Sequence, residues 1–295
     1  MNVLKIIDSH IHPIPGVISP DEIIREMKKN SVEKGVILGM DLDHHTLDNP
    51  KWKKHFEQSL EYWLLDTNQI IEAMRYILKN GNTPNKLIHQ AINTYPDSLI
   101  GFGSVQIGYQ SKKYVTNKLK EIFEFGFKGI KILPTLQFYN PEKNKRLEDV
   151  FKFAEKNDLI LTIHTGCDPG PWEFPALSKT GNPELLKPIL KKFPSVKVIL
   201  AHLGSYSAKS PAIWLKETVN VFQSLPDHQL YGDISAVPYL VENEEYINKL
   251  RIIGINKILF GSDYPVTRAS LEECINPVKN SKYLTNDEKR LILYN

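Results

Sequence analysis

Short apolar runs alternate with amphipathic helical segments about eight times along the 295 residues, and this alternation constrains the fold more than any other feature of the sequence. The runs lack the polar alternation of a strand with one face in water, so they predict parallel strands buried on both faces. About eight such units predict an α/β fold, a (β/α)8 TIM barrel that closes its sheet without free edges. The strands are expected at residues 3–12, 35–40, 99–105, 127–133, 159–164, 196–202, 230–236 and 257–263.

The barrel is predicted to be a single domain over residues 1–295, because no linker or internal repeat divides the chain. An open doubly wound sheet is the alternative, but no Gly-x-Gly-x-x-Gly follows the first strand. One helical insertion after the second strand, at about residues 41–68, interrupts the alternation. It carries Trp52, Phe56, Tyr62 and Trp63, so part of it is expected to cover the mouth of the barrel or to pack on a second subunit.

Composition excludes several classes of function. Lys and Arg number 37 against 34 Asp and Glu, and no basic block resembles a nucleic-acid footprint. No apolar run reaches membrane-spanning length, and no signal peptide opens the sequence. Two cysteines are too few for a disulfide framework. These features predict a cytoplasmic protein that acts on a small molecule, with no nucleic-acid or membrane partner, and they leave a homo-oligomer open.

Polar metal-ligand side chains stand at the ends of the predicted strands. His10 and His12 are two residues apart, so both imidazoles leave the same face of the first strand. His164, His202 and Asp263 end the fifth, sixth and eighth strands. A histidine at one of these positions is more often a satisfied core residue, but in a barrel the carboxyl ends of the strands share one rim. The joint pattern therefore predicts a metal site.

Four ordered motifs resemble the amidohydrolase superfamily, in its amidohydrolase 2 branch of metal-dependent TIM-barrel hydrolases. The motifs are Asp8-Ser9-His10-Ile11-His12, Ile163-His164-Thr165-Gly166, Leu200-Ala201-His202-Leu203-Gly204 and Phe260-Gly261-Ser262-Asp263-Tyr264-Pro265. Each motif alone is weak evidence, whereas the ordered set is specific and covers most of the chain. The resemblance is poorest at the insertion and at the extreme C-terminus.

The resemblance implies a metal site and an activity. His10, His12, His164 and Asp263 are expected to hold a divalent metal, most often one Zn²⁺, and His202 is expected to act on the substrate as acid or base or to help hold a second ion. The ion would lower the pKa of a water toward about 7, and Asp263 would take the proton of that water. The expected reaction is hydrolysis of a small amide, ester or lactone-type bond. The alternative is non-oxidative decarboxylation of an aromatic or unsaturated acid, and a barrel without enzymatic activity is a third hypothesis that metal analysis would test.

Four further residues are candidates for binding the substrate. Lys131 shares its strand face with Gly129, so it can point inward. It could contact an acidic substrate, serve as a bridging carbamate as in other members of the superfamily, or be an ordinary structural lysine. Trp172 stands in a Pro-rich loop that either walls the substrate or packs on the rim. Tyr139 and Arg268 lie in strand-end loops with the same two alternatives.

Two other features are assigned no role in the site. Cys167 follows His164 by a short loop, and a bystander thiol is favoured over a nucleophile. His44 and His45 follow the second strand, where a surface pair is favoured over additional metal ligands.

Overall fold

The computed structural model of the chain describes residues 5–50, 54 and 66–294. It contains one parallel sheet in which neighbouring strands follow the order of the sequence from β1 to β8. This confirms the predicted (β/α)8 barrel. The strands are β1 Ile6–Ile11, β2 Val32–Leu38, β3 Leu99–Ser104, β4 Gly129–Ile132, β5 Ile160–Gly166, β6 Val198–Tyr206, β7 Leu230–Asp233 and β8 Ile258–Leu259.

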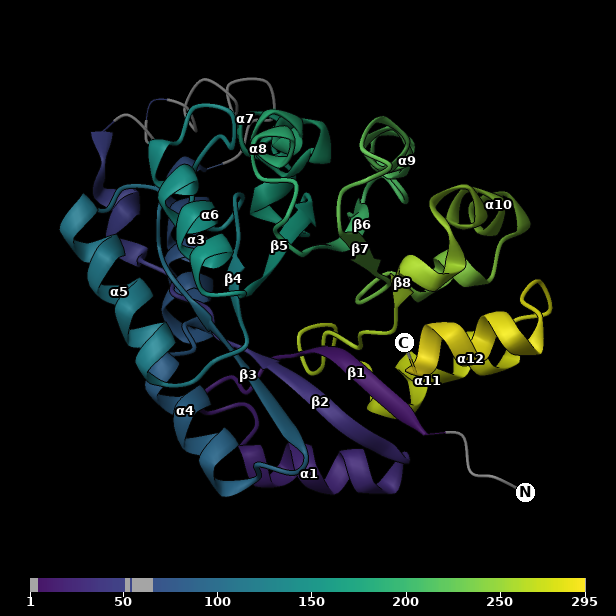
Figure 1. Cartoon of the computed structure of the whole chain (residues 1–295). Coiled ribbons are helices and arrows are strands. Elements are labelled where there is room, and N and C mark those ends of the chain that lie inside the picture. The colour runs from purple at the N-terminus through teal and green to yellow at the C-terminus, as the bar shows by residue number, and fades with distance from the viewer. Residues whose placement is uncertain (1–4, 51–53, 55–65, 295) are drawn as a thin grey trace.

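Helices surround the sheet on its outer face (Figure 1). They are α1 Pro20–Lys29, α3 Thr67–Gly81, α4 Asn85–Thr94, α5 Lys112–Glu124, α6 Lys145–Lys156, α7 Pro175–Ser178, α8 Lys187–Lys192, α9 Leu215–Ser224, α10 Glu244–Ile253, α11 Leu271–Asn280 and α12 Asn286–Tyr294. Local signals in the sequence define several of their ends. Ser19 forms a capping box with Glu22 at the start of α1, for example, and Pro20 takes the first helical position.

The ring is closed by hydrogen bonds between β1 and the segment that follows β8. The backbone N–H of Ser9 donates to Phe260 O at 2.9 Å, and that of Asp263 donates to His10 O at 2.8 Å. Further along, Ile11 and Tyr264 form a parallel bridge. The first strand and the last segment of the barrel are therefore directly bonded to each other.

The last two strands are shorter than the sequence predicts. β7 ends at Asp233 rather than at residue 236, and β8 covers only Ile258–Leu259 of the expected 257–263. After β8 the Phe260 N–H donates to Ile292 O of α12, and the backbone of Asp263 is left-handed with a φ of 59°. Both features interrupt the regular ladder, because the segment bends to carry Asp263 to the mouth of the barrel.

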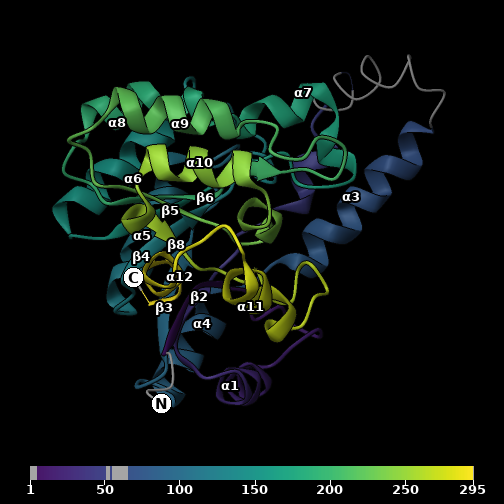
Figure 2. The ribbon, with the colours of Figure 1, turned by 90° about the vertical axis from the view of Figure 1, so that its right-hand side faces the viewer.

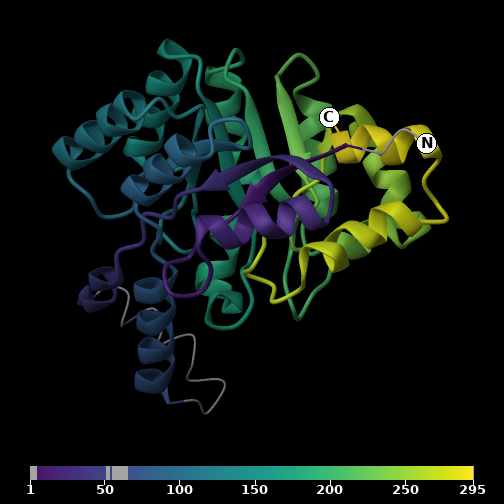
Figure 3. The ribbon, with the colours of Figure 1, turned by 90° about the horizontal axis from the view of Figure 1, so that it is seen from below.

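A second apolar cluster covers one side of the barrel mouth. It joins side chains of α3, such as Met74 and Leu78, with Leu42 and Trp172, and it is distinct from the main core. Figures 2 and 3 both show α3 projecting away from the barrel. In the predicted insertion, Leu42 lines the central cavity, whereas Trp52, Phe56, Tyr62 and Trp63 lie outside the described residues. Within the described ranges, no helix has the length and apolar character needed to cross a membrane.

Candidate metal centre

The side chains of the predicted metal site gather at the carboxyl ends of the strands, where a TIM barrel carries its functional residues. β1 and the residue after it supply His10 and His12, while β5 and β6 supply His164 and His202. Asp263 comes from the loop after β8. Each of these side chains is at most 3% exposed, so the site is built from buried polar groups.

Two imidazoles and one carboxylate converge on a single point. His10 Nε2 lies 3.1 Å from His12 Nε2, and each nitrogen is 3.4 Å from Asp263 Oδ1. On the far side of each ring, Nδ1 contacts an atom that can only accept a hydrogen bond. His10 Nδ1 is 2.9 Å from Asp233 Oδ2, and His12 Nδ1 is 3.3 Å from Leu38 O. Both Nδ1 atoms must therefore carry the hydrogen, which leaves a lone pair on each Nε2.

This arrangement fits a metal ion. Two nitrogen lone pairs facing each other at 3.1 Å repel unless a positive charge lies between them. Ligand atoms at about 2.1 Å from a tetrahedral Zn²⁺ are separated by about 3.4 Å, close to the spacing of the three donor atoms here. The burial of His10 lowers its pKa well below the ordinary value, so the ring is neutral, as a metal ligand must be.

Lys131 reaches the same point from β4. Its Nζ atom is 3.0 Å from His10 Nε2, and its side chain is completely buried. Among the described residues, no carboxylate lies within ion-pair distance of this nitrogen. Burial lowers the pKa of Lys131 to about 8. The side chain of Lys131 points inward, the position that the sequence analysis left open, and its amine can turn to a neighbouring anion or donate to His10.

His164 and His202 form a second pair beside the first. His202 Nε2 is 3.1 Å from His164 Nδ1, and His202 Nδ1 is 2.8 Å from the carbonyl oxygen of Ser235. The carbonyl can only accept, so His202 holds its hydrogen on Nδ1 and keeps a lone pair on Nε2. Burial lowers the pKa of His202 well below the ordinary value. The ring is therefore a neutral base whose Nε2 lone pair faces Nδ1 of His164.

His164 also contacts an acid that the sequence analysis did not single out. Its Nε2 lies 3.0 Å from Asp168 Oδ2, at ion-pair distance but without the alignment of a hydrogen bond. Among the described residues, the donor atoms that gather within 4.8 Å of one another around the first pair are those of His10, His12 and Asp263, without His164. The assignment of His164 as a metal ligand stays a prediction.

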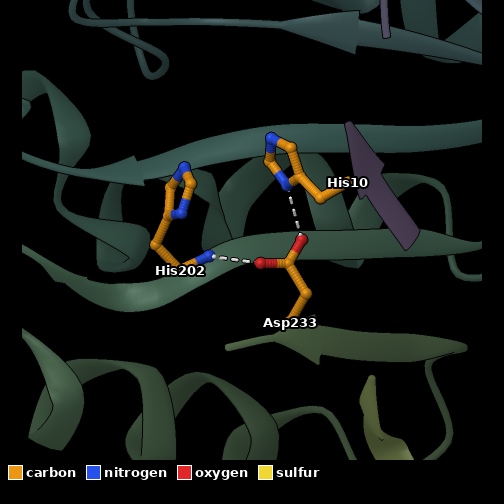
Figure 4. Close-up of side chains that lie close together, drawn as sticks. All are labelled: His10, His202 and Asp233. Atoms are coloured by element: carbon orange, nitrogen blue, oxygen red, sulfur yellow. Dashed lines mark hydrogen bonds and ion pairs between the residues drawn. The ribbon is translucent and has the colours of Figure 1, made fainter. Parts of the chain in front are cut away.

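Asp233 is a buried residue of the site that sequence reasoning missed. It lies at the end of β7 and contacts both His10 and the backbone of His202 (Figure 4). The signal in the sequence is weak, because only Leu230-Tyr231-Gly232 precede it, a shorter run than those before His164 and His202. The seventh strand was predicted to continue to residue 236, and Asp233 therefore counted as an interior strand position.

The backbone at the site adopts conformations that side chains rarely take. His202, Asp263 and Asp168 have φ values of 61°, 59° and 61°, in the left-handed region. Strained backbone of this kind is concentrated at functional sites, where the surrounding structure enforces it. Gly261 lets the strand ends approach, because a Cβ there would lie 2.8 Å from the Cβ of His10. The fold holds these residues in place at a cost in stability.

A cavity of about 360 Å³ opens above the two histidine pairs. Its walls are largely apolar, with Met40, Leu42, Leu133 and Trp172 among them. An apolar pocket with a few convergent polar groups is typical of a site for a small molecule.

The four predicted substrate-binding residues divide between two places. Lys131, Trp172 and Arg268 line the central cavity. Tyr139 does not, because its side chain is only 4% exposed, packs in the main core and borders a separate hollow beside α6. Tyr139 is therefore not a residue of the candidate site.

Cys167 and the pair His44 and His45 lie outside the cavity. Burial raises the pKa of the Cys167 thiol to about 12, which is the opposite of what a nucleophile needs. The rings of His44 and His45 are tilted against each other with centroids 4.1 Å apart. Their donor atoms lie within 4.8 Å of one another and of a carboxylate oxygen of Asp43, and the group does not line the cavity.

The fold and the site define a TIM-barrel protein with a buried cluster of metal-ligand side chains beneath a cavity. The sequence profile of the amidohydrolase family matches residues 79–294, most of the chain, and the protein belongs to this family. No curated protein sequence matches the chain.

Solved structures of low sequence identity share the whole fold. An uncharacterized TIM-barrel protein from Bordetella bronchiseptica is 19% identical with a TM-score of 0.69, and the match covers 99% of this chain and 96% of that one. A probable 2-pyrone-4,6-dicarboxylic acid hydrolase from Acinetobacter baumannii with citric acid bound is 16% identical, with a TM-score of 0.63 and coverage of 98% and 96%. An amidohydrolase from Burkholderia multivorans with bound zinc is 12% identical, with a TM-score of 0.60 and coverage of 98% and 96%.

Proposed function

We propose that this chain is a metal-dependent hydrolase that cleaves a small amide, ester or lactone-type bond in a substrate carrying a carboxylate. The observation that supports it most is the convergence of His10 Nε2, His12 Nε2 and Asp263 Oδ1 at 3.1 to 3.4 Å. One Zn²⁺ is the ion that suits this mixed nitrogen and oxygen donor set. When bound, the ion would supply a Lewis acid and lower the pKa of water toward about 7.

The remaining steps of the proposed reaction are assigned to side chains of the protein. The Asp263 carboxylate would take a proton from the attacking water. His202 is neutral with a lone pair on Nε2, so it can accept a proton there and return it to the leaving group. The apolar wall that includes Trp172 would displace water when a substrate binds, and this would strengthen the charged contacts in the cavity.

Two cationic side chains in one cavity support the proposal that the substrate carries a carboxylate. Lys131 and Arg268 both line this cavity, and within the described ranges Lys131 has no carboxylate partner. A substrate carboxylate would supply the anion that the buried amine lacks. The Acinetobacter relative holds citric acid, a carboxylate ligand, which is consistent with this class.

The test is a panel of carboxylated lactones, esters and amides assayed in parallel for acid release and for CO₂ release. Metal-dependent acid release is expected, and CO₂ release without hydrolysis would favour the decarboxylase alternative and overturn the hydrolase. Arg268→Gln should raise KM for the carboxylated substrate about tenfold, the scale of one charged hydrogen bond, with little change for the uncharged methyl ester. Arg290→Gln, at an exposed position of α12, is the matched control.

A further inference from the structure

Asp233 is completely buried and does not line the cavity, yet it contacts two histidines of the site (Figure 4). Its Oδ2 accepts a hydrogen bond from His10 Nδ1 at 2.9 Å. Its Oδ1 accepts one from the backbone N–H of His202 at 3.0 Å. One carboxylate therefore links a predicted metal ligand with the proposed acid–base residue.

Ser235 completes this link. Its hydroxyl makes a short hydrogen bond to Asp233 Oδ1, and because a carboxylate can only accept, the hydroxyl donates. The hydroxyl oxygen is then an acceptor, and it lies 2.9 Å from Nδ1 of both His10 and His202. Both imidazoles thus have acceptors on their Nδ1 side and need a hydrogen there.

By their spacing alone, His10, His202 and Asp233 resemble a metal site. Donor atoms of His10, His202 and Asp233 lie within 4.8 Å of one another. The Ser235 hydroxyl, however, is within hydrogen-bond distance of all three side chains. It occupies the position that an ion would take, so this cluster is a hydrogen-bond network.

We propose that Asp233 and Ser235 are a positioning pair that fixes His10 and His202 in the tautomer with the hydrogen on Nδ1. In this tautomer His10 Nε2 is free to bind the metal, and His202 Nε2 is free to exchange a proton with the substrate. The role of His202 rests on the proposed function. The role of His10 depends only on metal binding.

Asp233→Asn tests the pair because its geometry dictates the outcome. The backbone N–H groups of His202 and Ser235 both donate to Oδ1, so the introduced amide must place its oxygen there. Its NH₂ group then faces His10 Nδ1, and two donors meet. His10 is expected to shift its hydrogen to Nε2, the atom that would bind the ion.

The experiment measures two properties that need no substrate. In the metal-free protein, ¹⁵N NMR of the imidazole rings reports the tautomer of each histidine. Zinc affinity is measured by competition with a chromophoric chelator. Asp233→Asn should move the His10 hydrogen to Nε2 and weaken zinc binding about 10- to 100-fold, the usual effect of losing the hydrogen-bond partner of a metal-bound histidine.

Asp8→Asn is the matched control. Asp8 is equally buried and contacts the backbone N–H of His10 but not its ring. This variant should keep the wild-type tautomers and a zinc affinity close to that of wild type. A loss of zinc affinity equal to that of Asp233→Asn would assign the effect to general disruption of the barrel mouth and overturn the proposal.

If Asp233→Asn does not fold, the tautomers of the wild-type protein still test the proposal. Wild-type His10 and His202 should both show the Nδ1–H tautomer in the metal-free state, and finding either with its hydrogen on Nε2 overturns the proposal. If these signals are as expected but no substrate is hydrolysed, the proposed function fails and the positioning of His10 stands.

Discussion

Lys131 Nζ lies 3.0 Å from Nε2 of His10, the atom that we assign to the metal ion. A protonated amine and a divalent cation repel each other at this distance. Without a carboxylate partner among the described residues, the buried amine also destabilises the metal-free protein. A lysine at this position could therefore bind a substrate anion, but it lowers the stability of the metal-free protein.

Lys131→Met should accordingly stabilise the metal-free protein at pH 7. The folded pKa of about 8 lies below the unfolded value near 10.4, so the cost of the charge is complete below pH 8 and disappears above about pH 10.5. We expect a gain of about 1–3 kcal/mol at pH 7 and a smaller one at pH 10, measured by urea unfolding with a chelator. Lys128→Met on the exposed phase of the same run is the control. An equal gain at both pH values would contradict the assignment.

Replacing His10 and His12 together with alanine should abolish stoichiometric metal binding. Each contributes an Nε2 lone pair to the point where Asp263 Oδ1 also converges. We expect about one divalent ion per wild-type chain, measured by metal analysis of the purified protein. His89→Ala, on α4 and outside the cavity, should keep the metal. Stoichiometric metal in the double variant would rule out this centre.

Asp263→Asn should leave the barrel folded and lower turnover at least about a hundredfold, the scale of a general base. Asp263 does not cap the helix that follows it, because Ser270 forms the capping box of α11 with Glu273. His202→Asn should also reduce turnover while leaving the metal content nearly intact. Turnover by Asp263→Asn at the wild-type rate would remove Asp263 from the mechanism.

Asp8→Ala should destabilise the fold far more than Asp8→Asn. Asp8 Oδ1 accepts hydrogen bonds from the backbone N–H groups of His10 and Ser262, both at 3.0 Å. Alanine leaves both groups buried without an acceptor, at a cost of about 1–3 kcal/mol each, whereas asparagine retains the oxygen. Thermal unfolding of the two variants side by side measures the difference, and equal melting temperatures would show that these bonds contribute little.

The sequence predicts the barrel and most of the centre because both depend on strong, local patterns. An apolar run that ends in histidine identifies a strand and its carboxyl end together, which is why His10, His164 and His202 could be assigned. The phase that Lys131 shares with Gly129 in β4 made an inward direction feasible. These predictions need only periodicity and the topology of the barrel.

What the sequence could not predict depends on where strands end and on contacts across the ring. Asp233 looked like an interior strand residue until β7 was seen to end there. Asp168 meets His164 only because the backbone of its loop turns through a left-handed residue. Tyr139 follows a strand as Lys131 and Trp172 do, yet packing alone decides that it lies in the core.

The bonds between β1 and the segment after β8 have a consequence for how the protein is made. His10 and His12 are synthesised with β1, before the strands β2 to β8, while Asp263 emerges from the ribosome only after all of them. A growing chain therefore carries two of the three converging ligands without being able to assemble the centre. Because an ion that binds only the closed ring stabilises it by mass action, metal capture would report that the two ends of the barrel have met.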